Sequence, residues 1–183
     1  MFRPLQHAAL VGFGCASPVV AWASPAERVE ASFGQSLVFV DQGVLSQAGP
    51  QKRTVPASSA LFLLEYRLWP SFGPMAMGNV PLSTVRKLNQ DDVFIDEYIA
   101  IALALGVRWS PVAIALTEKA TFEPQLGLLI GRTFGSTLED RFFPLLATRM
   151  HVALTDGLCL YMGGAYSFHA DTLTLLYGVG HRF

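Results

Sequence analysis

Two-residue alternation of large apolar residues is the feature that most restricts what this chain can fold into. In the clearest case, one parity carries large residues: Ile99, Ile101, Leu103, Leu105, Val107 and Trp109. The other parity is mostly small or charged: Tyr98, Ala100, Ala102, Ala104, Gly106 and Arg108. A β-strand puts alternate residues on opposite faces, whereas a helix would mix the two sets around its circumference. The pattern therefore predicts strands with one apolar face and one crowded, partly charged face.

The same alternation recurs along the chain and predicts eight strands. They cover the ranges 28–40, 60–69, 73–81, 94–109, 119–134, 142–154, 158–168 and 172–183. The third is the least regular, because Pro74, Gly78 and Pro81 all disfavour a position in a β-ladder. The segment 155–157 predicts a tight turn in which a glycine supplies a positive φ. An even number of such strands is typical of single-chain bacterial barrels. We therefore expect an all-β fold, an eight-stranded antiparallel transmembrane up-and-down β-barrel.

The connections between these strands fall into two kinds. Segments 41–59 and 82–93 are long and polar, so we expect them to be loops that face outward from one end of the barrel. The other connections are mostly short turns, as expected at the opposite end. Segment 110–118 departs from this rule, being longer and more apolar than a simple turn.

The composition fits apolar strands better than apolar helices. The chain is 51% hydrophobic and 15% charged, whereas charged residues usually make up about 25%. Beyond its start, no window holds the roughly 18 uninterrupted apolar residues of a spanning helix. A membrane helix through the alternating segment would be interrupted by Arg108 and Pro111. The formal net charge of −1 and the lack of a basic stripe give no reason to expect a nucleic-acid partner.

Alternation alone does not say which face lies inside. A secreted lipocalin-like barrel, with its apolar face inward, would show the same pattern. However, the small-and-charged parity would make a poor exterior for a soluble protein, while its alanines and glycines suit a crowded interior. We therefore expect the apolar parity to face outward.

The first residues have the pattern of a cleaved signal peptide. Arg3 supplies the positive start, residues 8–20 the apolar stretch, and 21–23 (Ala-Trp-Ala) a small-x-small cleavage site. We expect a signal peptide at 1–23 and a barrel domain at 24–183. The alternative, a lipoprotein anchored through Cys15, lacks a leucine three positions before that cysteine. Cleavage leaves Cys159 as the lone cysteine, which predicts a buried, inert thiol and no disulfide framework.

Aromatic residues are predicted to gather at the two ends of the strands. Trp69, Trp109 and Phe183 would end strands at one interface. A second group would lie near the opposite interface: Phe39, Phe62, Phe134, Phe142, Phe143 and Phe168. Two such girdles are typical of barrels that span a bilayer.

Two stretches of the chain resemble strands of the OmpA-like outer-membrane β-barrel superfamily. They are Gln125 to Gly131, within the sequence FEPQLGLLIG, and the ending LYGVGHRF at 176–183. The resemblance covers most of the chain after the leader as a pattern, but only these two stretches as motifs. It implies the bacterial outer membrane, contact with its lipid, and a terminal aromatic residue that the barrel-assembly machinery recognises. His181 departs from the family pattern, since such strands often have tyrosine there, and it places a titratable group at the lipid interface.

The predicted interior collects polar and charged residues. They are Glu30, Glu65, Arg67, Arg108, Arg149, His151, Tyr161 and Arg182, to which we add Glu123 and Arg132. An eight-stranded barrel is only wide enough for its own side chains, and buried charges are costly unless they pair. We therefore expect an interior ion-pair network with a structural role. The alternative is a narrow pore lined by the same residues, which its arginines would make selective for anions.

The sequence gives little sign of catalysis or metal binding. Some small barrels hydrolyse lipid acyl chains, and Ser167, His169 and Asp171 cluster near an expected outer turn. That spacing has little specificity, so we expect no enzyme and no catalytic residue. We expect no metal and no cofactor either, because the remaining histidines fall at different strand ends and one cysteine completes no zinc pattern.

The expectation that combines these observations is a structural or interaction protein of the bacterial outer membrane. It would be a packed barrel that presents segments 41–59 and 82–93 outward, to other cells, surface polymers or envelope components. The nature of that outer partner does not follow from the sequence.

Overall fold

The computed structural model describes residues 28–46, 49–88, 94–98, 101–134, 142–154, 157–168 and 172–183. The predicted signal peptide at 1–23, with Cys15, lies outside these ranges. No helix within them is long and apolar enough to cross a membrane.

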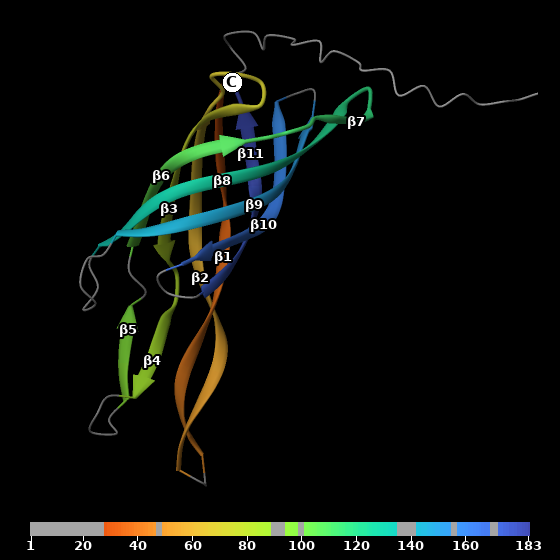
Figure 1. Ribbon diagram of the computed structural model, residues 1–183. Helices are drawn as coiled ribbons and strands as arrows, with labels where there is room; N and C mark the ends of the chain where they lie inside the picture. Colours follow the sequence, from red (N-terminus) through yellow and green to blue (C-terminus); the bar gives the residue numbers. More distant parts are fainter. Residues whose placement is uncertain are drawn as a thin grey trace, which may run out of the picture.

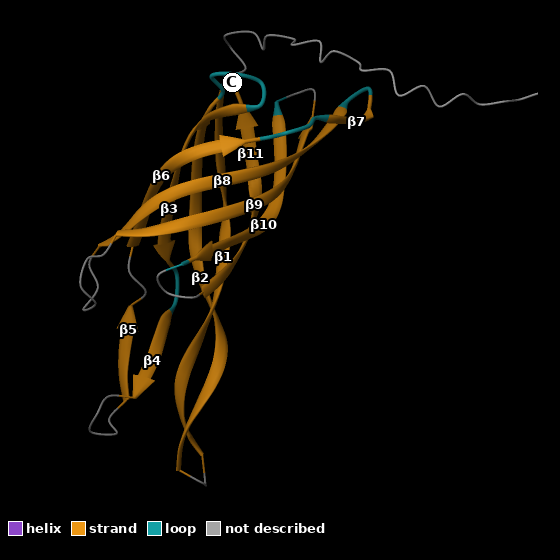
Figure 2. Cartoon of the chain, in the orientation of Figure 1, coloured by secondary structure: helices purple, strands orange, loops and turns teal. Residues whose placement is uncertain are grey.

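The described residues form eleven strands (Figures 1 and 2). In chain order they are β1 (Val29–Ser46), β2 (Gly49–Tyr66), β3 (Phe72–Pro81), β4 (Thr84–Leu88), β5 (Phe94–Tyr98), β6 (Ile101–Trp109), β7 (Ile114–Thr117), β8 (Ala120–Phe134), β9 (Phe142–Leu154), β10 (Leu158–Ser167) and β11 (Thr172–Arg182).

Eight of these strands close into an antiparallel barrel. Their order is β6-β3-β2-β1-β11-β10-β9-β8, and β8 pairs back onto β6. At the seam between β1 and β11, the Val29 and Phe183 backbones exchange two hydrogen bonds. Of the other strands, β7 pairs with the start of β8, and β4 pairs with β5 as a separate hairpin. The expected all-β, eight-stranded antiparallel barrel is confirmed.

Each of the eight predicted strands corresponds to one barrel strand, but the ranges 28–40, 60–69 and 94–109 were wrong. The range 94–109 contains two strands, β5 and β6, in different sheets. Segment 41–59 is not a loop, because β1 and β2 continue in register up to the pair Ser46 and Gly49. Alternation could not reveal that extension, since it lies beyond the barrel, where no interior imposes an apolar parity. The longer connections also contain strands, β4 within 82–93 and β7 within 110–118.

The third strand forms despite its prolines, because each lies where a ladder has ended. The ladder between β3 and β2 ends at Met75, and Pro74, the residue before it in the chain, lies just outside that ladder. The last residue paired with β6 is Asn79, and Pro81 lies beyond it. The Leu82 N–H donates to the Ser58 carbonyl. The backbone N–H groups of even-numbered residues of β3 therefore point toward β2, and those of odd-numbered residues point toward β6. Neither proline therefore removes a hydrogen bond from the ladder on its side. Of the predicted turn at 155–157 the structure describes Gly157, which has a φ of 80° and donates its N–H to the Leu154 carbonyl at 3.1 Å.

The closed sheet has an apolar outer wall. Exposure alternates along β6, where Leu105 is 69% exposed and Arg108 is fully buried. Large exposed apolar residues occur on all eight barrel strands.

The interior has an apolar layer and a charged layer. The apolar layer consists of Leu61, Leu63, Met75, Ala104, Leu129, Leu145, Ala147, Ala165 and Leu176, with Met77 and Phe143 packed against it. On β2, β6, β8 and β9 these residues lie farther from the C-terminal end of the barrel than the charged residues of the same strand. The apolar layer therefore closes the interior between the charges and the opposite end.

Two hairpins extend from the end of the barrel opposite the C-terminus (Figure 1). The longer one is the continuation of β1 and β2 beyond Val38, the last residue of β1 that pairs with β11. The shorter one is β4–β5, and β4 lies against β1. The barrel thus has one end with tight turns and one end with long, sheet-forming projections.

Candidate functional site

The charged side chains inside the barrel gather toward the end that holds the C-terminus. All eight residues predicted for this network turn inward: Glu30, Glu65, Arg67, Arg108, Arg149, His151, Tyr161 and Arg182. Each lies at an inward-facing position of its strand, except Arg67, which directly follows the last residue of β2. Arg182 is the most accessible of them, with its side chain 16% exposed. The closed sheet thus brings residues from six strands to one layer.

Glu30 connects one side of this layer. Its Oε1 atom lies 2.8 Å from Nε2 of His151, and its Oε2 atom lies 3.3 Å from Nη2 of Arg182. The Arg67 guanidinium is 3.8 Å from the same Oε2 atom. A single buried carboxylate therefore faces three nitrogen-bearing side chains from three parts of the chain.

Glu123 is the second carboxylate of the network. Arg67 donates two hydrogen bonds to it, of 3.2 and 2.6 Å, one to each carboxylate oxygen. This paired geometry is the strongest form of an arginine–carboxylate contact. Arg182, His151 and Arg108 also lie within 4 Å of its oxygens. Glu123 thus joins the Glu30 cluster to the rest of the layer.

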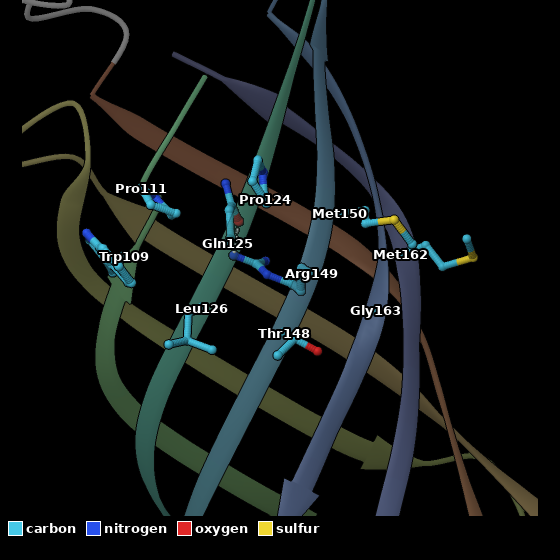
Figure 3. A pocket seen from close by; sticks show the side chains of 10 residues that line it. All are labelled: Trp109, Pro111, Pro124, Gln125, Leu126, Thr148, Arg149, Met150, Met162 and Gly163. Atoms are coloured by element: carbon cyan, nitrogen blue, oxygen red, sulfur yellow. Dashed lines mark hydrogen bonds between the residues drawn. The ribbon is translucent and has the colours of Figure 1, made fainter. Parts of the chain in front are cut away.

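Glu65 is the third carboxylate, and Arg149 donates a hydrogen bond to it. The same guanidinium donates to Oε1 of Gln125 at 2.6 Å, a contact seen in Figure 3. Gln125 in turn donates to Glu123 at 3.4 Å and so links the two carboxylates. Sequence reasoning did not single out Gln125, although its parity, two residues after Glu123, was a signal that could have found it.

Tyr161 fits where the wall has no side chains. Gly34 and Gly178 pair across the β1–β11 seam, and a Cβ added to either would lie within 2.7 Å of the Tyr161 hydroxyl. The Arg149 guanidinium lies 5.6 Å from the centre of the tyrosine ring. The two glycines therefore make the space that the ring occupies.

Two expectations were wrong by parity: Arg132 was placed in the interior, and Phe143 was placed among the aromatic residues of an interface. Arg132 shares the outward parity of Ile130 and lies over the rings of Phe134 and Phe142, at 5.2 and 5.4 Å. The strand has no register shift between Ala120 and Arg132, so a residue nine positions after Glu123 must face the other way. Conversely, Phe143 packs against the apolar layer inside. Its neighbour Phe142 is 70% exposed, and adjacent strand residues cannot share a face.

Most of the predicted aromatic residues are exposed at the ends of the barrel strands. Trp69, Trp109 and Phe183 are each about half exposed at the C-terminal end, and Phe39, Phe134, Phe142 and Phe168 are exposed at the other. Phe62 was misplaced, because β2 begins well before residue 60. It lies in the middle of the wall, opposite Phe33, with their ring centres 5.1 Å apart.

One group of interior residues has the right atoms for a metal ion. The ligand atoms of Glu30, His151 and Cys159 lie within 4.8 Å of one another, and all three residues are buried. Sequence reasoning missed this convergence, because the three residues come from β1, β9 and β10. However, two arginines lie within 4 Å of the Glu30 carboxylate and would repel a divalent cation. The Cys159 thiol instead donates to the Gly157 carbonyl at 3.5 Å.

The catalytic alternative finds no support among the described residues. Ser167 is buried on the inward parity of β10, away from the outer wall where a lipid chain would lie. His169 and Asp171, the other two members of that cluster, lie outside the described residues.

An open groove of about 400 Å³ crosses the outer wall over β8, β9 and β10 (Figure 3). Its outward side chains include Trp109, Leu126, Met150 and Met162, with Thr148 between them. None of these carries an acid, a base or a metal ligand suited to catalysis. The interior layer is therefore the candidate site, and its chemistry is that of a buried ion-pair network.

Substituting Glu123 tests how much this network stabilises the barrel. Glu123→Ala leaves Arg67 without its paired acceptor inside the barrel, so we expect the free energy of unfolding to fall by about 3–5 kcal/mol. The control is Glu118→Ala, in the exposed turn between β7 and β8, where a change within about 0.5 kcal/mol is expected. Urea unfolding of the refolded proteins measures both. Equal small losses in the two variants would show that the interior network contributes little.

Comparisons with known proteins give structural neighbours only. No family model and no curated protein matches the sequence. The structure is similar to that of Ail, the attachment invasion locus protein of Yersinia pestis, with a TM-score of 0.41 and 18% identity over 86% of this chain and 99% of that one. It is also similar to Neisserial surface protein A, with a TM-score of 0.43 and 14% identity over 85% of this chain and 97% of that one.

Proposed function

We propose that this chain is an integral barrel of a bacterial outer membrane, with a sealed interior and two hairpins held outward for contact with a partner. The observation that carries the proposal is the inverted distribution of side chains. Leu105, Ile130 and Phe142 are 69%, 64% and 70% exposed on the wall, whereas Arg108 and His151 are fully buried inside. Soluble proteins rarely expose an apolar surface that runs around the whole molecule. Lipid removes the cost of that exposure.

Polar groups on the outer wall support the same proposal. The Tyr177 hydroxyl donates to the side-chain oxygen of Gln35, and both residues are on the outward parity. In hydrocarbon an unpaired amide or hydroxyl is costly, so such groups are expected to pair. Closure of the barrel also gives the backbone N–H and C=O groups of its strands hydrogen-bond partners, because no strand edge is left free. Exposed aromatic residues at both ends of the strands are what two interfaces with headgroups require.

The resemblance to the OmpA-like superfamily suggests how the barrel would be inserted into the membrane. Under the proposal, the strand that ends in Gly-x-Gly-x-Arg-Phe is recognised by the barrel-assembly machinery after export. The Phe183 side chain is 59% exposed, beside the seam where the barrel closes, and is therefore available for such recognition.

A pore is less well supported than a sealed barrel. An arginine-lined channel needs a continuous polar path, and the apolar layer around Leu61, Leu129 and Leu176 interrupts it. These three side chains are at most 2% exposed. The barrel therefore serves as a rigid base, and its projections are the surfaces left for function. The β1–β2 hairpin continues as a two-stranded ribbon, which holds a binding surface away from the lipid more firmly than a loop.

A charge placed on the wall tests the membrane part of the proposal. In hydrocarbon, Leu105→Arg is expected to cost about 2–4 kcal/mol and to lower the fraction of folded, heat-modifiable protein in membranes. The matched control is Leu116→Arg, on β7 outside the closed barrel, where the side chain is also exposed, at 56%. If both variants fold as well as the wild type, the wall faces water and the proposal fails.

Proteolysis of intact cells tests which end faces outward. Trypsin is expected to cut after Lys52 or Arg53, on the β1–β2 hairpin, without breaking the cells. Lys119 lies in the turn beside the opposite end, where Ala120 pairs with Leu154, and it is expected to be cut only after lysis. Mass spectrometry of the fragments separates the two results. Cleavage at Lys119 alone in intact cells would reverse the proposed orientation.

A further inference from the structure

We propose that the interior of the barrel binds one small monovalent anion, of the size and charge of chloride, at Arg108. This inference goes beyond the proposed function and does not depend on it, because it concerns only the balance of charges and hydrogen bonds inside the barrel.

Arg108 is the least satisfied side chain of the network. It is fully buried, and none of its three guanidinium nitrogens has a hydrogen-bond partner. Its nearest carboxylates are Glu65, 3.5 Å from Nε, and Glu123, 3.9 Å from Nη1. Arg67 donates to both oxygens of Glu123, and Arg149 donates to Oε1 of Glu65, whereas Oε2 of Glu65, the oxygen nearest Arg108, accepts no hydrogen bond. A buried guanidinium that offers five N–H groups and receives no acceptor is costly.

The unpaired groups around it are nearly all donors. Among the described interior residues, the unpaired atoms that can only donate are the three nitrogens of Arg108, Nε of Arg67, Nη1 of Arg149 and Nε of Arg182. The Tyr161 hydroxyl and Nδ1 of His151 are also unpaired and can donate or accept. The only unpaired atom that can act solely as an acceptor is Oε2 of Glu65. A water molecule that accepts from two of these donors must donate its own two hydrogens to other acceptors. A halide ion brings only acceptor capacity.

The charges of the network show the same imbalance. The ion-paired interior side chains that the structure describes include four guanidinium groups, on Arg67, Arg108, Arg149 and Arg182. Opposite them are three carboxylates, on Glu30, Glu65 and Glu123. Counted over these seven side chains, the layer carries one excess positive charge. One bound anion neutralises this excess.

The surroundings also favour a small ion that exchanges slowly. The apolar layer closes one side of the site, and on the other side lie the mostly buried Arg67 and Arg182, with side chains 8% and 16% exposed. Ion pairing strengthens as the local dielectric falls, so an anion held there gains more than it would at the surface.

Crystals grown from protein refolded in bromide test the site directly. We expect an anomalous scattering peak in contact with the Arg108 guanidinium, inside the barrel. Peaks confined to the outer surface would indicate an adventitious ion only and would overturn the proposal, as would the lack of any peak.

Thermal unfolding after refolding in sodium chloride or sodium gluconate, at equal ionic strength, gives a second measurement. If chloride is present at ten times its dissociation constant, the unfolding midpoint should be roughly 3–6 °C higher in chloride. Arg108→Met should abolish this difference. Arg132→Met, which removes the outward-facing arginine, should retain it. Equal midpoints for the wild type, or the same difference in Arg108→Met as in the wild type, would overturn the proposal. If Arg108→Met does not fold, the wild-type comparison and the bromide crystals still decide.

Discussion

The pairing of β8 with β6 is the constraint on which the rest of the structure depends. It closes the sheet, so the eight barrel strands have no free edge and each of their residues faces either the wall or the interior. Side-chain parity then decides the environment of every residue. A register slip of one residue would carry Arg108 to the wall and Leu105 to the interior. The order of large and small residues along each strand is therefore what holds the register.

Closure also explains why the interior is built in two layers. The cross-section of an eight-stranded barrel admits side chains but little else, so charges placed there must find partners among their neighbours. Each of the three interior carboxylates lies within ion-pair distance of two or more arginine side chains. The apolar layer next to them needs no partner and fills the remaining length of the barrel. The same crowding explains the glycine pair Gly34 and Gly178, which leaves room for one tyrosine ring.

Much of this arrangement could be predicted from sequence, because alternation reports directly on the two faces of a closed sheet. The eight barrel strands and the inward direction of residues such as Arg149 and His151 follow from that pattern. The extension of β1 and β2 did not, because a ribbon outside the barrel has no interior to impose a parity. Contacts between distant strands, such as the Glu30–His151 hydrogen bond, depend on the stagger between strands, which the sequence does not display.

The errors at single positions have simpler causes. Arg132 was assigned to the interior for its charge, although strict alternation on β8 puts it outside, where two phenylalanine rings cover its guanidinium. Phe143 was assigned to the wall for its aromatic ring, although its neighbour already faced that way. Residue type was given more weight than parity in both cases, and parity was the better guide.

Spin-label accessibility along β6 in phospholipid vesicles tests the central claim most directly. Single cysteines at residues 103, 105 and 107, in a background where Cys159 is replaced by alanine, would carry the label. The account predicts that labels at all three positions are relaxed by lipid-dissolved oxygen but not by a water-soluble nickel chelate. Relaxation of the odd positions by the nickel chelate, as strong as at an exposed position on β7, would contradict it.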